Sequence, residues 1–232
     1  TAYRRQRQMC IRDREVSVRS LIRPIFPCRA CNSPISIVTM TRIIAGAAAA
    51  TQLDVPARGT RPTSDKVREA LFSSLESWFD FADARVLDLY AGSGALGLEA
   101  VSRGAESLVL VEQAAKAARI ARANVSKVLL RCQQPVPQVS VATASVRHWL
   151  ANAIGMFDLV FCDPPYDLPT EVLEGDLALL RQRLSEDALV VVERSTRTAA
   201  ITLPQGYSLW RTRDYGETQI SYLEVAPIEP AA

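Results

Sequence analysis

The chain has 232 residues and a mass of 25.4 kDa, which suits one large domain or one domain with an appendage. Hydrophobic residues make up 48% and charged residues 22%, and no stretch approaches the roughly 20 continuous apolar residues of a bilayer-spanning helix. A membrane protein, a collagen, a coiled coil and a disordered chain are therefore excluded. The net charge of +2 is uneven, because residues 1–38 hold eight arginines against two acids and so carry +6, which leaves −4 for the rest.

The acidic body has no bulk positive field of the kind that usually grips nucleic acid. Contact with nucleic acid would therefore require a local basic patch, or other molecules already on the substrate. The five cysteines are an odd number in a chain large enough to fold without disulfides, so we expect a reducing cytoplasm. Cys28 and Cys31 form a single pair with no further ligands nearby, and we expect no metal site.

Residues 1–39 show no sustained helical or strand periodicity and combine scattered arginines with prolines. We expect a disordered or non-native extension here, with a basic arm that binds RNA as the alternative. Met40 precedes the strand-like Thr41–Ile44, which indicates a biological start at that methionine. This segment lacks the continuous apolar stretch of a targeting peptide, so we do not expect one here.

Short apolar runs rich in β-branched residues alternate with helical stretches from residue 65 onward. This alternation predicts a parallel sheet with helices on both faces. Two alternating runs around Tyr215-Gly216 predict a terminal antiparallel hairpin. The predicted helices are 65–79, 95–103, 114–128, 146–153 and 170–184, and the predicted strands are 85–90, 107–111, 138–142, 157–162, 187–192, 207–214 and 217–225.

The pattern Gly92-x-Gly94-x-x-Gly97 joins a predicted strand to a predicted helix, as nucleotide-binding loops do. Asp88 precedes this loop, where its charge would repel the pyrophosphate of a nicotinamide dinucleotide. S-adenosylmethionine has no phosphate, and its ammonium and sulfonium groups are positive. Glu112 ends the next strand and can accept hydrogen bonds from both ribose hydroxyls. The alternative is that Asp88 only caps the turn.

Asp163-Pro164-Pro165-Tyr166 follows the apolar strand 157–162, at the same carboxyl edge of the sheet. The prolines stiffen the backbone, so the Asp163 carboxylate and the Pro164 carbonyl become two rigid acceptors for the N–H bonds of an exocyclic amine. Tyr166 would stack on the base. The sequence thus predicts methyl transfer to nitrogen. The alternatives are that the prolines only end a strand and that Tyr166 lies at the rim without stacking.

Four segments carry a more specific pattern, namely 41–46, 61–72, 87–100 and 163–166. In these segments the chain resembles the RsmD family of 16S rRNA guanine-N2 methyltransferases, bacterial enzymes that modify guanine 966. The Arg-Pro-Thr segment at 61–72 is the specific one. Glycine loops and Asp-Pro-Pro-Tyr also occur in DNA adenine, DNA cytosine-N4 and protein glutamine methyltransferases.

The resemblance implies a Rossmann-like, class I S-adenosylmethionine-dependent methyltransferase fold. Its mostly parallel seven-stranded sheet would end in an antiparallel hairpin. We expect a β-hairpin and helix extension over 40–82 and the methyltransferase domain over 83–232. The implied partner is 16S rRNA in the small ribosomal subunit or its assembly intermediate, and the protein is expected to be a monomer.

The candidate site residues fall into three groups. Asp163, Pro164, Pro165 and Tyr166 are the catalytic candidates. The cofactor-binding candidates are Thr63, Asp88, Tyr90, Gly92, Ser93, Gly94, Gly97, Glu112 and Ser145. The RNA-binding candidates are Arg42, Arg58, Arg61, Lys66 and Arg68, a local basic patch whose alternative is solvated surface charge.

One position departs from the pattern of many methyltransferases. An acidic residue after the third strand commonly receives the adenine amino group, and this chain has Thr143-Ala144-Ser145 there. Backbone groups or the Ser145 hydroxyl would have to replace that acid.

Other functions remain open from the sequence. A DNA amino methyltransferase shares the chemistry but would have to flip its base out of a duplex. A nicotinamide-dependent oxidoreductase is favoured only by the three glycines. A non-catalytic RNA-binding assembly factor could have kept the same fold.

Overall fold

A computed structural model of the chain describes residues 40–56 and 65–227. The predicted extension over 1–39 and the candidates Arg58, Arg61 and Thr63 lie outside the described residues. No helix within the described ranges is long and apolar enough to span a membrane.

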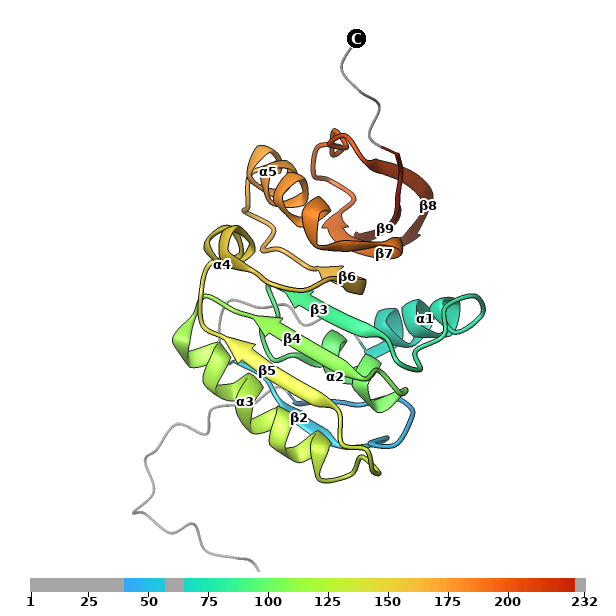
Figure 1. The fold of residues 1–232 in the computed structure, drawn as a ribbon, viewed down its shortest axis with the longest axis vertical. Helices are drawn as coiled ribbons and strands as arrows, with labels where there is room; N and C mark the ends of the chain where they lie inside the picture. Colours follow the sequence, from blue (N-terminus) through green and yellow to red (C-terminus); the bar gives the residue numbers. More distant parts are fainter. Residues whose placement is uncertain (1–39, 57–64, 228–232) are drawn as a thin grey trace, which may run out of the picture. The chain divides into compact units, whose positions relative to one another are not determined.

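A seven-stranded sheet forms the centre of the described chain, in the order β5-β4-β3-β6-β7-β9-β8 (Figure 1). The first five strands in this order run parallel, and β9 runs antiparallel to both of its neighbours. The predicted fold class is confirmed. The strands are β3 (Arg85–Leu89), β4 (Ser107–Val111), β5 (Gln138–Ala142), β6 (Phe157–Cys162), β7 (Leu184–Ser195), β8 (Tyr207–Tyr215) and β9 (Thr218–Val225).

Helices cover both faces of the sheet because successive strand residues point to opposite sides. Val86 on β3 belongs to a core that includes residues of α1, α2 and α3, whereas its neighbour Leu87 belongs to a second core with residues of α4 and α5. Figure 1 shows α4 and α5 on the side of the sheet opposite α1. The helices are α1 (Asp65–Leu75), α2 (Ala95–Ser102), α3 (Ala115–Leu129), α4 (Val146–Asn152) and α5 (Thr170–Leu180).

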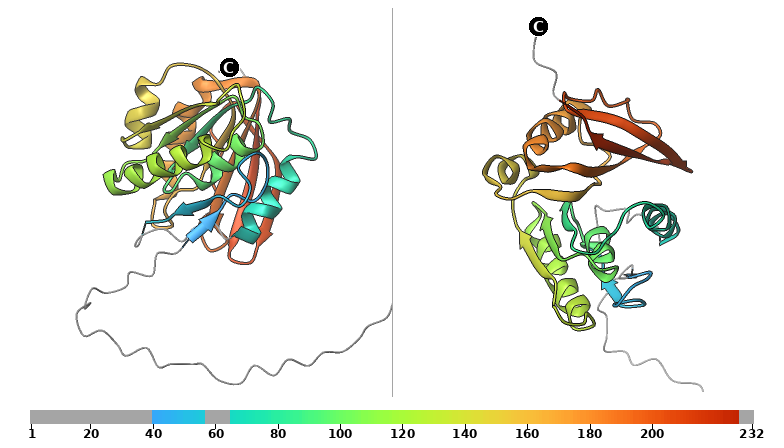
Figure 2. Two further views of the ribbon diagram at one scale, coloured as in Figure 1. Left: turned by 90° about the horizontal axis from the view of Figure 1, so that it is seen from below. Right: turned by 45° about the vertical axis from the view of Figure 1, so that its right-hand side comes forward.

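A separate two-stranded sheet precedes the helices and strands of the main sheet. β1 (Met40–Arg42) pairs antiparallel with β2 (Gln52–Asp54), and Figure 2 shows this hairpin in blue, apart from the red β8–β9 pair. The turn of the hairpin is tied to the end of α2, where Ala48 N donates to Ser102 Oγ at 2.9 Å. Gly46 makes the approach possible, because a Cβ there would lie 1.9 Å from the Ser102 carbonyl oxygen.

Two predicted helices end earlier in the structure. The helix predicted over 65–79 ends at Leu75, and Trp78 beyond it packs edge-on against Trp210 of β8, with ring centroids 4.4 Å apart. The helix predicted over 170–184 ends at Leu180 and passes through a 3₁₀ turn into β7. Both helices are therefore four residues shorter than predicted.

Candidate active site

The glycine loop follows β3 and leads into α2. Gly92 and Gly94 have φ of 56° and 79°, left-handed values that glycine adopts without steric cost. Gly97 serves packing instead, because a Cβ there would lie 2.6 Å from Leu108 Cδ1 on β4. The three glycines therefore form a tight loop and hold α2 closely against the sheet.

Asp88 lies beneath this loop with only 1% of its surface exposed. Its Oδ2 accepts a hydrogen bond from Gly97 N at 2.9 Å, so the carboxylate caps the first turn of α2. Burial, with a smaller contribution from nearby Glu112, raises the pKa of Asp88 to about 7. Asp88 therefore caps the turn, and it also lines the cavity described below.

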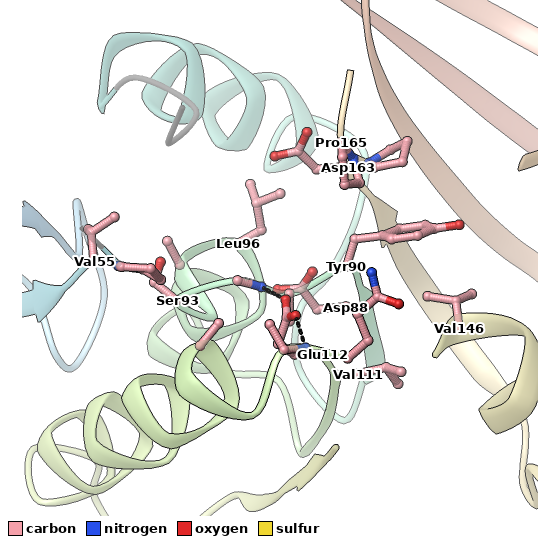
Figure 3. Close-up of a pocket in the computed structure, with 18 of the residues that line it drawn as sticks. Val55, Asp88, Tyr90, Ser93, Leu96, Val111, Glu112, Val146, Asp163 and Pro165 are labelled. Atoms are coloured by element: carbon pink, nitrogen blue, oxygen red, sulfur yellow. Dashed lines mark hydrogen bonds between the residues drawn. The ribbon is translucent and has the colours of Figure 1, made fainter. Parts of the chain in front are cut away.

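Glu112 follows the end of β4 and holds the glycine loop from the other side. Its Oε2 accepts from Gly92 N at 2.9 Å and its Oε1 from Ala114 N at 2.7 Å, as the dashed lines in Figure 3 show. Each carboxylate oxygen has a second lone pair free to accept from a ligand hydroxyl. Glu112 thus fixes the loop and still presents acceptor oxygens to the cavity.

Tyr90 takes a left-handed conformation with φ of 62°, which is uncommon for a residue with a bulky side chain. Its hydroxyl donates to Asp176 Oδ2 of α5 at 2.6 Å. Burial and this bond together raise the pKa of the Tyr90 hydroxyl well above its usual range. The tyrosine is therefore a neutral, fixed wall of the cavity.

A cavity of about 490 Å³ opens beside these side chains, within the range of small-molecule sites (Figure 3). β3 and β6 are neighbours, with Leu89 paired to Cys162, so the residues that follow both strands meet at one edge. The candidates that line the cavity are Asp88, Tyr90, Gly92, Ser93, Glu112, Asp163, Pro164, Pro165 and Tyr166.

Three cofactor-binding candidates within the described residues do not line the cavity. Gly94 and Gly97 lie on the loop and helix behind it. Ser145 is exposed, and its hydroxyl accepts from His148 N at 3.3 Å as the cap of α4. Its neighbour Val146 contributes to the lining instead.

The basic patch differs from the prediction. Arg42 and Lys66 are exposed, as phosphate contacts require. Arg68 is wrongly predicted as a surface contact, because its side chain is 1% exposed and turned inward beneath the hairpin. Its Nη2 donates to Thr41 Oγ1 and to Asp65 Oδ1, each at 3.0 Å, and to the Arg42 carbonyl. Arg68 also lines the cavity.

Two buried polar residues that the sequence did not single out support the site. Glu99 on α2 accepts from the backbone N–H groups of Ile44 and Ala45, at 2.7 and 3.0 Å. Asn124 on α3 donates through Nδ2 to the Ser93 carbonyl at 2.9 Å and binds the backbone of Asp54. Neither residue belongs to a spacing pattern that indicates such a role.

Comparisons with known proteins agree with this architecture. A family model described as "Conserved hypothetical protein 95" matches residues 41–224. The Escherichia coli K12 protein "Ribosomal RNA small subunit methyltransferase D" is 34% identical over 184 residues, which are 78% of this chain and 87% of the relative. A solved hypothetical protein from Thermus thermophilus has a TM-score of 0.66 and 33% identity, and the match covers 80% of this chain and 99% of that one.

A more distant solved structure shares only the fold. The magnesium protoporphyrin IX methyltransferase of Synechocystis PCC 6803, solved with bound S-adenosylmethionine, has a TM-score of 0.55 and 17% identity, covering 69% of this chain and 79% of that one.

The family match spans the hairpin, the glycine loop and the Asp-Pro-Pro-Tyr turn together. The chain therefore belongs to the family of that model and of the proteins named ribosomal RNA small subunit methyltransferase D, as its motifs indicated.

Proposed function

We propose that this protein transfers a methyl group from S-adenosylmethionine to the exocyclic N2 amine of a guanine in 16S rRNA, guanine 966 of that RNA. The observation that carries the proposal is the shared cavity, in which Asp163 and Pro164 lie with the glycine loop and Glu112. A cofactor held by the loop and an amine held by Asp163 would meet in one space.

The donor would supply an electrophilic methyl group on a positive sulfur, beside a lining that is rich in carboxylates. Glu112 would accept from the ribose hydroxyls. The Asp163 carboxylate and the Pro164 carbonyl would accept the two N–H bonds of the amine, which turns its lone pair toward the methyl carbon. As the nitrogen–carbon bond formed, the sulfur would keep the electron pair of the carbon–sulfur bond. Asp163 would stabilise the positive charge that develops on nitrogen until the extra proton passes to solvent water.

The base would be held at the mouth of the cavity. Tyr166 is 47% exposed, so its ring is free to stack on a flipped base. Arg42 and Lys66 would bind phosphates from the extension over 40–82, and residues 83–232 would form the catalytic domain. We further propose that the protein acts as a monomer in the cytoplasm, on the small ribosomal subunit or its assembly intermediate.

The test is incubation of the purified protein and labelled donor with naked 16S rRNA, with small subunits that lack the modification, and with duplex DNA. Mapping of the product should find N2-methylguanine at one position of 16S rRNA. Methyl transfer to DNA would favour the amino methyltransferase of DNA instead. Calorimetric binding of NAD without binding of S-adenosylhomocysteine would replace the proposal by an oxidoreductase. Cofactor binding without transfer to any substrate would indicate an assembly factor.

A further inference from the structure

Arg68 has donors that the protein leaves unused. An arginine has five N–H groups, and the three described acceptors of Arg68 all face Nη2. Nη1 and Nε are buried and have no hydrogen-bond partner. The nearest acid to Nε is Glu99, at 3.9 Å, and its oxygens already accept from Ile44, Ala45 and Arg103.

Unused donors of a buried guanidinium are energetically unfavourable, because burial removes water as a partner. Asp65 and Glu99 balance the charge of Arg68 but do not use these N–H groups. Burial also lowers the pKa of Arg68, although an arginine remains protonated in proteins. A ligand with acceptor oxygens would complete the set.

The charges that line the cavity indicate which ligand group this is. Its acidic side chains are Asp88, Glu112, Asp163 and Asp167, and Arg68 is the one cation among the described residues of the lining. S-adenosylmethionine has two positive groups, the ammonium and the sulfonium, and one negative group, the carboxylate. The acids suit the two cations, which leaves the carboxylate for Arg68.

We propose that the Nη1 group of Arg68, which points away from Nε, binds the carboxylate of the methionine end of the cofactor. Arg68 is then a cofactor-binding residue on α1, and it is not an RNA contact. Its fixed Nη2 joins this contact to the hairpin through Thr41 and the Arg42 carbonyl. The inference rests on the proposed use of S-adenosylmethionine.

The probe is decarboxylated S-adenosylmethionine, which keeps the adenosine, the sulfonium and the ammonium and lacks only the carboxylate. Calorimetry should show that the wild-type protein binds S-adenosylmethionine about 10- to 100-fold more tightly than this analogue. In the Arg68→Lys and Arg68→Met variants, the affinity for S-adenosylmethionine should fall close to that for the analogue. The affinity for the analogue itself should stay nearly unchanged. Glu69→Gln, an exposed change on the same helix, should leave both affinities unchanged.

Three outcomes would overturn the inference. The wild-type protein could bind S-adenosylmethionine and the analogue with equal affinity, or folded Arg68 variants could keep the full preference for S-adenosylmethionine. The variants could also lose affinity for both ligands equally, which would indicate a structural role. Should the variants unfold, nuclear magnetic resonance of the wild-type protein decides. The Arg68 Nη1–H signals should shift with S-adenosylmethionine and not with the analogue, and an equal response to both would contradict the proposal. Failure of the wild-type protein to bind either ligand would instead refute the proposed function.

Discussion

At the scale of single residues, the carboxylates of the cavity have different surroundings and different roles. Asp88 is buried and bonded to the backbone of α2, and Glu112 is bonded to the loop that it faces. Asp163 is partly exposed, and it lies between the end of β6 and two prolines. Only Asp163 combines exposure to the cavity with a stiffened backbone, which is why we assign the amine to it.

Replacement of Asp163 by Ala should lower the rate of methyl transfer by about 100-fold or more, because one of two acceptors that orient the amine is removed. The affinity for S-adenosylhomocysteine should change little. Single-turnover kinetics with 16S rRNA and calorimetry measure the two effects. Asp167→Ala is the matched control, since this exposed acid lines the same cavity outside the tetrapeptide. Wild-type turnover in Asp163→Ala would refute the mechanism.

The raised pKa of Asp88 predicts a pH effect on stability. Its pKa is about 7 in the folded protein against 3.8 ordinarily, so the folded state binds the proton more tightly between these values. The stabilisation is fully present below pH 3.8 and is lost as the pH rises to about 7, with a slope that approaches about 1.4 kcal/mol per pH unit.

Asp88→Asn should remove this contribution. Denaturant titrations of both proteins across pH 4 to 8 would give the difference in unfolding free energy, which should move in favour of the asparagine variant as the pH rises. A difference that is independent of pH would contradict the assignment.

At the scale of helices and strands, the sequence located most of the parallel strands closely, but β7 extends three residues beyond each end of the predicted 187–192. The strands predicted over 107–111, 138–142 and 157–162 match β4, β5 and β6 residue for residue. β4 and β6 are short, mostly buried apolar runs, whereas the edge strand β5 alternates exposed polar residues with valines. The C-terminal ends of α1 and α5 were each missed by four residues, and the apolar Trp78, which continues the spacing of α1, packs against β8 outside the helix.

The inward position of Arg68 was also missed, although one signal for it exists. Arg68, Leu71, Phe72 and Leu75 are spaced three and four residues apart, and they are the buried residues of α1. Charge alone suggested a surface position. Two of its acceptors, Thr41 and the Arg42 carbonyl, belong to the hairpin, and no pattern within α1 reveals them.

Gly46 should be essential to the junction between the hairpin and α2. Gly46→Ala places a Cβ against the Ser102 backbone at a φ of +83°, and we expect a loss of about 3 kcal/mol or more in unfolding free energy. Gly216→Ala is the control, because its φ is +65° but nothing lies within 4 Å of the added Cβ. It should cost only the backbone strain, about 1 to 2 kcal/mol. Equal losses in urea titrations would disprove the steric argument.

At the scale of the whole molecule, the hairpin, α1 and the glycine loop are linked by buried polar contacts. Glu99 and Ser102 connect the hairpin to α2, and Asn124 connects β2 to the loop. The cavity includes Val55 and Pro56, which follow β2, as well as Arg68. The proposed RNA-binding extension therefore contributes part of the wall of the proposed cofactor site.

RNA affinity should depend on the two exposed cations of this extension. The double change of Arg42 and Lys66 to Gln should weaken 16S rRNA binding. The slope of log affinity against log salt concentration should fall in magnitude by about 1 to 2, because one phosphate fewer is neutralised for each cation removed. Filter binding at several salt concentrations measures the slope. Arg131→Gln, an exposed change beyond the end of α3, is the control. An unchanged slope in the double variant would show that neither residue neutralises a phosphate of the RNA.

The packing of Trp78 against Trp210 determines what the intrinsic fluorescence of this protein can report. Trp78, Trp210 and Tyr222 form a cluster with ring centroids 4.4 to 6.0 Å apart, where the segment after α1 meets β8 and β9. None of the described residues that line the cavity is a tryptophan. Emission from Trp78 and Trp210 will therefore follow detachment of the C-terminal strands, with Trp149 beside Phe157 as a separate contribution, whereas occupancy of the cavity is better followed by a labelled or calorimetric ligand.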